Sequence, residues 1–323
     1  MASAINQMFP PSPTFTDKNL PSQNGKVFII TGGSSGVGRE LAEILFRAGG
    51  KVYIAARSEV NAKKAIDDIK SSSSSSNVGE LAFLHLELDD LSIIKTSAET
   101  FMKKESKLDV LWNNAGVSLP PLGSVSRQGY ELMMATNCLG PLLFTQLLLP
   151  CLKNAAEASS PGSVRVVWTS SQYVDLKSPE GGLIMSEVET ATKDKAKNYG
   201  TSKIGNWLLG SEMARQVGQH GIISITQNPG NLKTNLMRHA KWMYYAAYPL
   251  LHKAKMGAFT ELFAGLSPEI TMEQNGGYVI PWGRVHDAPR KDLLVSLKSV
   301  EEGGNGRAEE FWNWCEEQIA KYK

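Results

Sequence analysis

Short apolar runs alternate along the chain with segments whose apolar residues recur at helical spacing. Residues 26–31 (KVFIIT) form a β-branched run that ends at a glycine pair, and residues 39–50 (RELAEILFRAGG) space apolar side chains three and four positions apart before a glycine stop. The alternation continues to residue 228. The expected strands span 26–31, 51–56, 81–88, 108–113, 164–170 and 223–228. The expected helices span 39–50, 61–70, 129–155 and 199–217.

Strands that are apolar almost throughout indicate a parallel sheet covered by helices on both faces. The pattern therefore predicts an α/β fold, a doubly wound parallel sheet of Rossmann-like type. Because no repeat or linker divides the chain, we expect one domain. It comprises an extended N-terminal arm (1–24), a main body (25–235) and a C-terminal extension (236–323) without a strand–helix alternation of its own.

Composition excludes several classes of protein. The 323 residues are 42% hydrophobic and 20% charged, and the net charge of +2 gives no nucleic-acid footprint. Three cysteines form no CxxC pair and five histidines are scattered, so we expect neither a disulfide framework nor a metal site. The N-terminus lacks a secretory signal, and no apolar stretch reaches the ~20 residues of a membrane helix, so we expect a cytoplasmic protein without a membrane span.

A glycine-rich loop follows the first strand. TGGSSGVG (31–38) lies between that strand and an amphipathic helix, where glycines let the backbone approach a pyrophosphate at the helix N-terminus. The alternative is a tight strand–helix turn without a ligand. No Gly-Lys-Ser/Thr follows, which excludes a nucleoside-triphosphatase loop. The residues expected to contact a dinucleotide here are Gly32, Ser34, Ser35, Gly36, Val37 and Gly38.

The end of the second strand bears on which dinucleotide is bound. An acidic residue there would bind the adenosine ribose hydroxyls, whereas a basic one accommodates a 2′-phosphate. The strand ends YIAARS, with Arg57 and no acid before Glu59, which favours NADP(H) over NAD(H). The alternative is that Arg57 is a solvated charge.

Two tyrosine–lysine pairs have the spacing of four residues. Tyr173 and Lys177 are followed by SPEGG, whose proline and glycines forbid a long helix, so their side chains are not expected to meet. Tyr199 and Lys203 open the helical pattern that runs to residue 217, where positions four apart share one face. We therefore predict that Tyr199 and Lys203 carry the chemistry, and that Tyr173 is a pocket wall or a surface aromatic.

Six motifs in order resemble the short-chain dehydrogenase/reductase family, of the retinol-dehydrogenase-like kind with many fungal members. The resemblance covers about residues 24–235, and parts of the tail are also similar. The motifs are TGGSSGVG (31–38), NNAG (113–116), Asn137 in ATNCLG, SS (170–171), YGTSK (199–203) and PGNLKT (229–234).

The resemblance implies roles for individual residues. Asn137, Ser171, Tyr199 and Lys203 would be the catalytic group. Asn113, Ala115 and Gly116 would line the adenine-ribose side and support the sheet. Pro229, Gly230 and Thr234 would hold the nicotinamide end, where Tyr199 and Lys203 also contact the cofactor. Glu87 stands where the family often has Asp, Trp112 stands where a small aliphatic residue is usual, and residues 172–198 form a long insertion.

In the implied chemistry, the Lys203 cation would lower the pKa of the Tyr199 phenol and bond the nicotinamide ribose. Ser171 would hydrogen-bond the substrate oxygen as its charge develops. Asn137 would hold a water that relays protons, or would only kink its helix.

The substrate is less determined by the sequence. Residues 235–263 (NLMRHAKWMYYAAYPLLHKAKMGAFTELF), rich in Tyr, Trp and Met, wall a greasy pocket or form an amphipathic helix buried in the core. The expected substrate is therefore a lipophilic ketone, aldehyde or alcohol, with a role in specialised metabolism conceivable. Two other functions stay open: a non-net-redox enzyme (isomerase, epimerase or cyclase) on the same site, and a non-catalytic NADP-binding scaffold. The family resemblance also allows a homodimer through the helices that follow Asn137 and Tyr199, unless the C-terminal extension blocks it.

Overall fold

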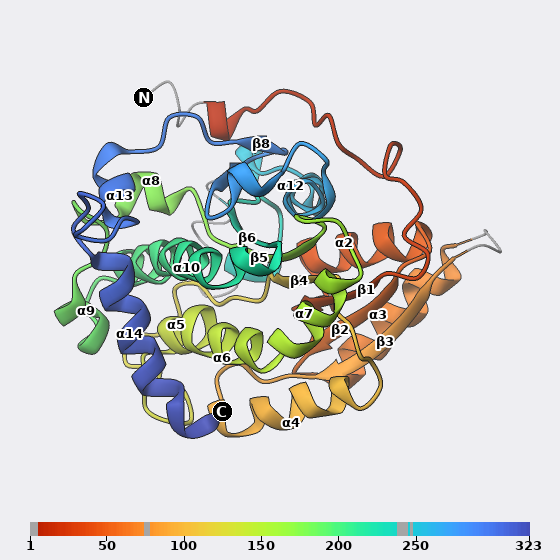
Figure 1. The fold of residues 1–323 in the computed structure, drawn as a ribbon, viewed down its shortest axis with the longest axis horizontal. Coiled ribbons are helices and arrows are strands. Elements are labelled where there is room, and N and C mark those ends of the chain that lie inside the picture. Colours follow the sequence, from red (N-terminus) through yellow and green to blue (C-terminus); the bar gives the residue numbers. More distant parts are fainter. Residues whose placement is uncertain (1–5, 74–77, 238–244, 246–247) are drawn as a thin grey trace.

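The fold is a single eight-stranded sheet between two layers of helices. The computed structural model describes residues 6–73, 78–237, 245 and 248–323 (Figure 1). Within these residues the strand order is β3-β2-β1-β4-β5-β6-β7-β8, and each neighbouring pair is parallel except β7 and β8. The strands are β1 (Val27–Thr31), β2 (Lys51–Ala56), β3 (Glu80–His85), β4 (Val110–Asn113), β5 (Val164–Thr169), β6 (Ile222–Gln227), β7 (Tyr278–Ile280) and β8 (Arg284–Val285). The predicted α/β class with a doubly wound parallel sheet is confirmed.

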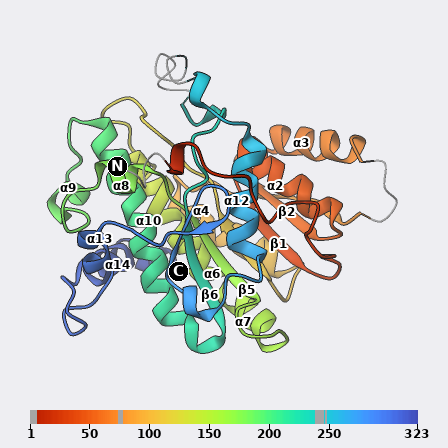
Figure 2. The same ribbon diagram turned by 90° about the horizontal axis from the view of Figure 1, so that it is seen from above.

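Helices cover both faces of this sheet (Figures 1 and 2). The helices are α2 (Gly36–Arg47), α3 (Glu59–Ser71), α4 (Leu91–Met102), α5 (Leu132–Met134), the π-helix η1 (Ala135–Leu139), α6 (Gly140–Leu147), α7 (Leu149–Glu157), α8 (Tyr173–Lys177), α9 (Met185–Glu189), α10 (Lys195–Val217), α12 (Ala254–Leu266), α13 (Lys291–Ser296) and α14 (Arg307–Ile319). Short 3₁₀ turns are η2 (Gly218–His220), η3 (Asn235–Met237), η4 (Tyr248–Leu250), η5 (Met272–Gln274) and η6 (Ala320–Tyr322). One apolar core lies under α2, α3 and α12, and the other lies under α4, α6, α7, α10 and α14.

Several helix boundaries differ from those that the sequence pattern predicts. The helix expected over 129–155 is broken into α5, η1, α6 and α7, with a bend of 53° between 132–147 and 149–157, where Pro150 lacks an N–H to continue the ladder. The helix expected over 199–217 begins earlier, at Lys195, because the Asp194 carboxylate caps it by accepting from the Ala196 and Lys197 N–H groups. Helix α4 was not predicted.

The C-terminal extension completes the sheet, contrary to the expectation that it lacks strand–helix alternation. Helix α12 leads into β7, which pairs in parallel with β6. Helix α14 then packs on α10, where the Phe311 ring fills the space beside Gly205. The extension therefore buries part of the α10 surface through which the family resemblance suggested pairing.

Helix α12 is held by two side chains from the sheet. The buried Arg165 guanidinium on β5 donates to the carbonyl oxygens of Ala264, Ser267 and Ile270 at the end of α12, at 2.9–3.1 Å. The indole of Trp112 on β4 donates to the Glu261 carbonyl oxygen at 2.9 Å and lies against Gly265, where a Cβ would be 2.2 Å from the nearest ring atom. The large residue at position 112 is thus accommodated by a glycine on α12.

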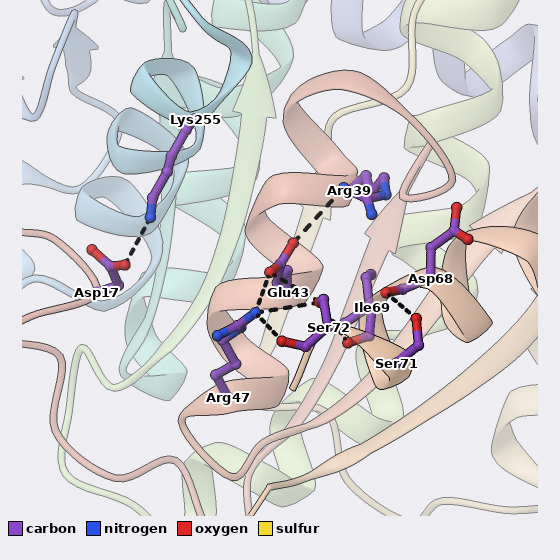
Figure 3. A network of polar contacts seen from close by, with 9 residues as sticks. All are labelled: Asp17, Arg39, Glu43, Arg47, Asp68, Ile69, Ser71, Ser72 and Lys255. Carbon is purple, nitrogen blue, oxygen red and sulfur yellow. Dashed lines mark hydrogen bonds and ion pairs between the residues drawn. The ribbon is translucent and has the colours of Figure 1, made fainter. Parts of the chain in front are cut away.

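Surface contacts tie neighbouring elements together (Figure 3). Arg47 on α2 pairs with Glu43 at 2.7 Å and donates to the Ser72 carbonyl oxygen just after α3. Lys255 on α12 pairs with Asp17 of the N-terminal arm at 2.8 Å. The arm therefore lies along the body of the protein.

Among the described residues, no single helix has the length and apolar character needed to cross a membrane; one bent pair, 132–147 with 149–157, meets that requirement by length and composition alone.

Candidate active site

The glycine loop forms a tight cradle between β1 and α2. Gly32 and Gly36 adopt φ angles of +70° and +57°, which favour glycine. At Gly38 a Cβ would lie 2.7 Å from the Asn114 amide nitrogen and 2.9 Å from the Gly32 carbonyl oxygen, so only glycine fits. Ser35 is the N-cap of α2, yet its side chain makes no capping hydrogen bond, and the first turn carries no acidic residue. The helix N-terminus thus suits an anion.

The NNAG segment links this cradle to the sheet. The Asn113 amide donates to the Thr145 hydroxyl at 2.9 Å, so this buried side chain supports the fold. Asn114, which the sequence did not single out, donates to the Thr31 carbonyl oxygen at 2.7 Å, and the Ala115 N–H donates to the Thr31 hydroxyl at 2.9 Å. Gly116 lies at the end of the segment, where a Cβ would be 3.2 Å from Asn137 Oδ1 and 3.4 Å from Lys203 Nζ.

The PGNLKT segment faces the same cradle. A Cβ on Gly36 would meet the Thr234 side chain at 3.5 Å. Gly230 has a φ of +90°, and its N–H donates to the Asn228 side-chain oxygen at 3.0 Å, which fixes the turn that begins at Pro229. The structure thus places Thr234 close to the glycine loop, so two separate parts of the predicted dinucleotide site lie near each other.

Ser171, Tyr199 and Lys203 meet at the carboxyl end of β5. The side chains of Ser171 and Tyr199 are hydrogen-bonded. Lys203 Nζ lies 5.7 Å from the centre of the Tyr199 ring and donates to the Thr169 carbonyl oxygen at 2.8 Å. Tyr199 and Lys203 are 5% and 3% exposed, so these two side chains are almost completely withdrawn from water, whereas Ser171 is half-buried.

Asn137 is held beside this group by the π-helix η1. Its amide donates to the Val117 carbonyl oxygen at 3.1 Å and to the Ser202 hydroxyl at 3.0 Å, while its oxygen accepts the Val117 N–H at 2.9 Å. Single π-turns inside α-helices are frequent at functional sites. Asn137 lies in the irregular part of its helix and also beside Lys203. It can therefore both kink the helix and hold a proton-relaying water.

Burial dominates the protonation of the site. Burial raises the pKa of Tyr199 above its usual value, although its hydrogen bond with Ser171 acts in the opposite direction. Burial lowers the pKa of Lys203 to about 8. The influence that opposes burial here is the hydrogen bond with Ser171, and a lowering of the phenol's pKa by Lys203 stays a prediction.

Tyr173 lies beside Tyr199, contrary to the alternative that it is only a surface aromatic. The two rings meet edge-on with centroids 5.2 Å apart. Tyr173 and Lys177 do share a short helix, α8, which the sequence did not predict, but Lys177 is exposed and packs its Cβ region against Gly200 of α10. Tyr173 therefore belongs to the wall of the site.

The surroundings of Tyr199 are apolar. Buried Leu119 and Met133 contact it, and Val117, Tyr173 and Ala196 pack on them. Leu119 has a φ of +51°, a strained value for a branched side chain. Backbone strain of this kind concentrates at binding and catalytic sites. Part of the greasy segment predicted over 235–263, namely residues 238–244 and 246–247, lies outside the described residues, and its end forms part of α12.

Arg57 is exposed at the carboxyl edge of the sheet. Its guanidinium is 66% exposed and lies 3.4 Å from the Asp89 carboxylate. Glu87 instead faces His85 at 3.3 Å. Arg57 is thus the basic group available at the end of β2, held by a weak surface pair.

The N-terminal arm reaches the rear of the site, which the sequence did not indicate. Gln7 is 2% exposed, and its amide nitrogen donates to the Asp175 carboxylate on α8 at 2.7 Å. Its oxygen accepts from the Asn228 amide at the end of β6 at 2.9 Å. Gln7 thus joins the insertion after Ser171 to the strand that precedes Pro229.

Two further features bear on the chemistry. Across 6–73, 78–237, 245 and 248–323, no three His, Cys, Asp or Glu side chains gather in a way that could hold a metal ion. Cys138, Cys151 and Cys315 are buried and free.

Comparison with known proteins gives a consistent result. A family model described as short chain dehydrogenase matches residues 26–243. The chain is 46% identical to the short-chain dehydrogenase/reductase iacJ of Pestalotiopsis fici, covering 98% of this chain and 97% of that protein. It is 44% identical to a short-chain dehydrogenase/reductase of Phomopsis amygdali, with 100% and 98% covered.

Solved structures share the fold. An uncharacterised protein from Mycobacterium Paratuberculosis superposes with a TM-score of 0.70 at 24% identity, over 96% of this chain and 98% of that one. A Sphingobium yanoikuyae short-chain dehydrogenase in complex with NADPH has a TM-score of 0.57 at 17% identity, over 73% and 82%. A Brucella melitensis 3-ketoacyl-(acyl-carrier-protein) reductase complexed with NADH has 0.58 at 20%, over 78% and 96%.

Proposed function

This chain belongs to the short-chain dehydrogenase/reductase family of NAD(P)(H)-binding oxidoreductases, and we propose that it interconverts a lipophilic ketone or aldehyde and its alcohol with NADP(H). The observation that carries the proposal is the contact of Ser171, Tyr199 and Lys203 in a buried site, with Gly116 of the nucleotide-side loop directly against Lys203.

The residues present fit a dinucleotide. The cradle at Gly32 and Gly38 has no room for a Cβ, and the N-cap side chain of α2 makes no capping bond. Residues 32 and 34–38 would hold the diphosphate, and residues 113, 115 and 116 would line the path toward Lys203. The turn of Pro229 and Gly230, with Thr234, would hold the nicotinamide end. When bound, the cofactor supplies or accepts the hydride.

Tyr199 is the proposed general acid in the direction of reduction. A carbonyl that accepts a hydride develops negative charge on oxygen, and a neutral phenol can donate its proton to that oxygen. The raised pKa of Tyr199 keeps the phenol protonated around neutral pH. Ser171, hydrogen-bonded to the same phenol, would hydrogen-bond the substrate oxygen as the charge develops.

Lys203 and Asn137 support that proton transfer. Lys203 would stabilise the phenolate that remains after donation, because its Nζ lies beside the Tyr199 ring. Its donation to the Thr169 carbonyl oxygen fixes this position. Asn137 would hold a water that relays protons to and from Lys203. Gly116 lies next to both side chains.

The choice of NADP(H) rests on Arg57. A 2′-phosphate at the end of β2 would meet an exposed guanidinium, and Arg is well suited to phosphate. The family includes NADPH- and NADH-bound structures, so this residue is the specific support for NADP(H) in the present chain.

The lipophilic substrate is inferred from the residues around Tyr199. Leu119, Met133 and the ring of Tyr173 would surround a substrate that approaches the phenol. Apolar walls with few polar groups are typical of sites for greasy small molecules.

Absorbance of NADPH tests the proposal. Purified protein is assayed against lipophilic ketones and aldehydes, with NADH in parallel. We expect consumption of NADPH with at least one carbonyl compound and a higher kcat/KM than with NADH. Substrate conversion without net consumption of either cofactor would contradict the reductase proposal and favour an isomerase, epimerase or cyclase.

A further inference from the structure

Glu261 is a carboxylic acid buried in the middle of the apolar helix α12. Glu261 is 0% exposed, and the surrounding sequence, GAFTELFAGL, is otherwise almost entirely apolar. One side-chain oxygen accepts from the Thr169 hydroxyl at 2.8 Å. The other, Oε2, is fully buried and has no partner among the described residues. A buried acid that is only half satisfied is costly and calls for a reason.

Thr169 connects Glu261 to the active site. Its side chain faces α12, where its hydroxyl also accepts from the Gln227 amide at 2.9 Å. Its carbonyl oxygen faces α10 and accepts from Lys203 Nζ and from the Asn206 amide, both at 2.8 Å. One residue of β5 therefore holds Glu261 on one side of the sheet and Lys203 on the other.

The charges around Glu261 single out Lys203. Burial raises the pKa of Glu261 to about 8, and the attraction of Lys203 opposes that rise. The other elements packed against α12 also carry charged groups. On α2, Arg39 and Glu43 pair with each other near the surface, and Glu40 beside them is half-buried. On β5, Arg165 binds carbonyl oxygens at the end of α12. The Tyr278 hydroxyl of β7 donates to the Ser171 carbonyl oxygen. β4 and β6 carry no ionisable side chain.

We propose that Glu261 is a positioning residue of the reductase reaction: neutral at low pH, it ionises as the pH rises and thereby keeps Lys203 protonated beside Tyr199. This inference rests on the proposed function. The proton that Glu261 loses passes to solvent, and the new carboxylate stabilises the Lys203 ammonium across β5. Without this carboxylate, burial would cause Lys203 to lose its proton at a lower pH.

The first experiment compares the pH dependence of kcat/KM for carbonyl reduction in the wild type and in Glu261→Gln. Glutamine keeps the acceptor for the Thr169 hydroxyl but never becomes negative. We expect the alkaline limb of the variant to move to lower pH by about one unit, with the acid limb unchanged. Glu269→Gln, on an exposed position after α12, is the matched control and should reproduce the wild-type profile. Coincident profiles for all three proteins would overturn the proposal.

A second measurement does not depend on activity. The folded state holds the Glu261 proton up to a pH of about 8, whereas the unfolded chain releases it near the ordinary carboxyl pKa. The folded state therefore binds more protons over that window, and stability falls as the pH rises. Glu261→Gln removes this loss, so its melting temperature should gain on the wild type between pH 5 and pH 8. No gain would show that Glu261 is already ionised when folded, and would overturn the proposal.

Failure of the proposed function and failure of the proposed role of Glu261 would give different results. If Tyr199→Phe retains full turnover, the proposed function fails, whatever Glu261 does. If Tyr199→Phe is inactive and Glu261→Gln keeps the wild-type pH profile, only the role of Glu261 fails. Should Glu261→Gln not fold, an infrared band of a protonated carboxylic acid in the ¹³C-Glu-labelled wild type, lost as the pH is raised through 8, supports the proposal, and its absence at pH 7 contradicts it.

Discussion

The ring of Tyr173 meets the ring of Tyr199 edge-on, with their planes 75° apart, so both tyrosines of the two Tyr–Lys pairs lie at one site. Their partners differ. Lys203 is buried beside Tyr199, whereas Lys177 is exposed on α8. The side chains of Tyr199 and Ser171 are hydrogen-bonded to each other, whereas Tyr173 donates to the Ser171 hydroxyl through its backbone N–H. This geometry supports the proposal that Tyr199 transfers the proton and that Tyr173 forms the wall of the site.

Substitution of Tyr199 by Phe should lower kcat by about 10²–10⁴-fold, because the proton donor is lost. NADPH affinity, followed by fluorescence titration, should stay within a few-fold of the wild type. Tyr173→Phe is the matched control: it keeps the ring and should alter KM at most. A variant at Tyr173 with lost kcat and normal KM would reverse the assignment.

Arg57→Ala should weaken NADPH binding about tenfold and leave NADH binding nearly unchanged, because a charge-assisted bond to the 2′-phosphate is removed. Dissociation constants for the two cofactors measure this. Asp89→Asn is the companion variant, since it frees Arg57 from its ion pair and should not weaken NADPH binding. Equal losses for both cofactors in Arg57→Ala would make Arg57 a bystander.

Gln7→Ala should destabilise the protein and raise KM. The half-buried Asp175 carboxylate and the buried Asn228 amide each lose a partner, at a cost of about 1–3 kcal/mol. Thermal melting together with steady-state kinetics measures both effects. Lys18→Ala, on an exposed position of the same arm, should change neither. If Gln7→Ala behaves like Lys18→Ala, the arm is not part of the site.

Arg165→Met should lower the free energy of unfolding by about 3 kcal/mol or more, because several buried carbonyls at the end of α12 lose their donors. Denaturant unfolding measures the change. Arg215→Met is the control: that guanidinium, 38% exposed, pairs with Glu302 on the surface and is worth about 1 kcal/mol at most. Similar losses for the two variants would contradict the role of Arg165.

Gly265→Ala should destabilise the protein because the new methyl group would come within 2.2 Å of the buried Trp112 ring. Overpacking of this kind costs about 1–3 kcal/mol. Lys64→Ala, at an exposed position inside α3, is the control and should be close to neutral. Equal unfolding midpoints for the two variants would mean that α12 moves to make room for the methyl group without loss of stability.

The sequence by itself determined the sheet as far as β6 and the glycine cradle, and it predicted the choice of Tyr199 over Tyr173. These depend on local signals: alternation of apolar runs, glycines at fixed offsets, and a spacing of four on an uninterrupted helix. The parallel pairing of these strands and the position of Lys203 beside the Tyr199 ring agree with those signals.

Only the tertiary structure decided what surrounds the site. Gln7 reaches Asn228 across 221 positions of sequence, and Thr169 reaches Glu261 across 92. Neither contact leaves a periodic signal, because single polar pairs between distant segments follow from how the elements pack. Glu261 alone left a trace, as one charge inside an apolar run. The protonation of Tyr199 was likewise undecidable from spacing, since it depends on burial, which the packing of α10 against β5 imposes.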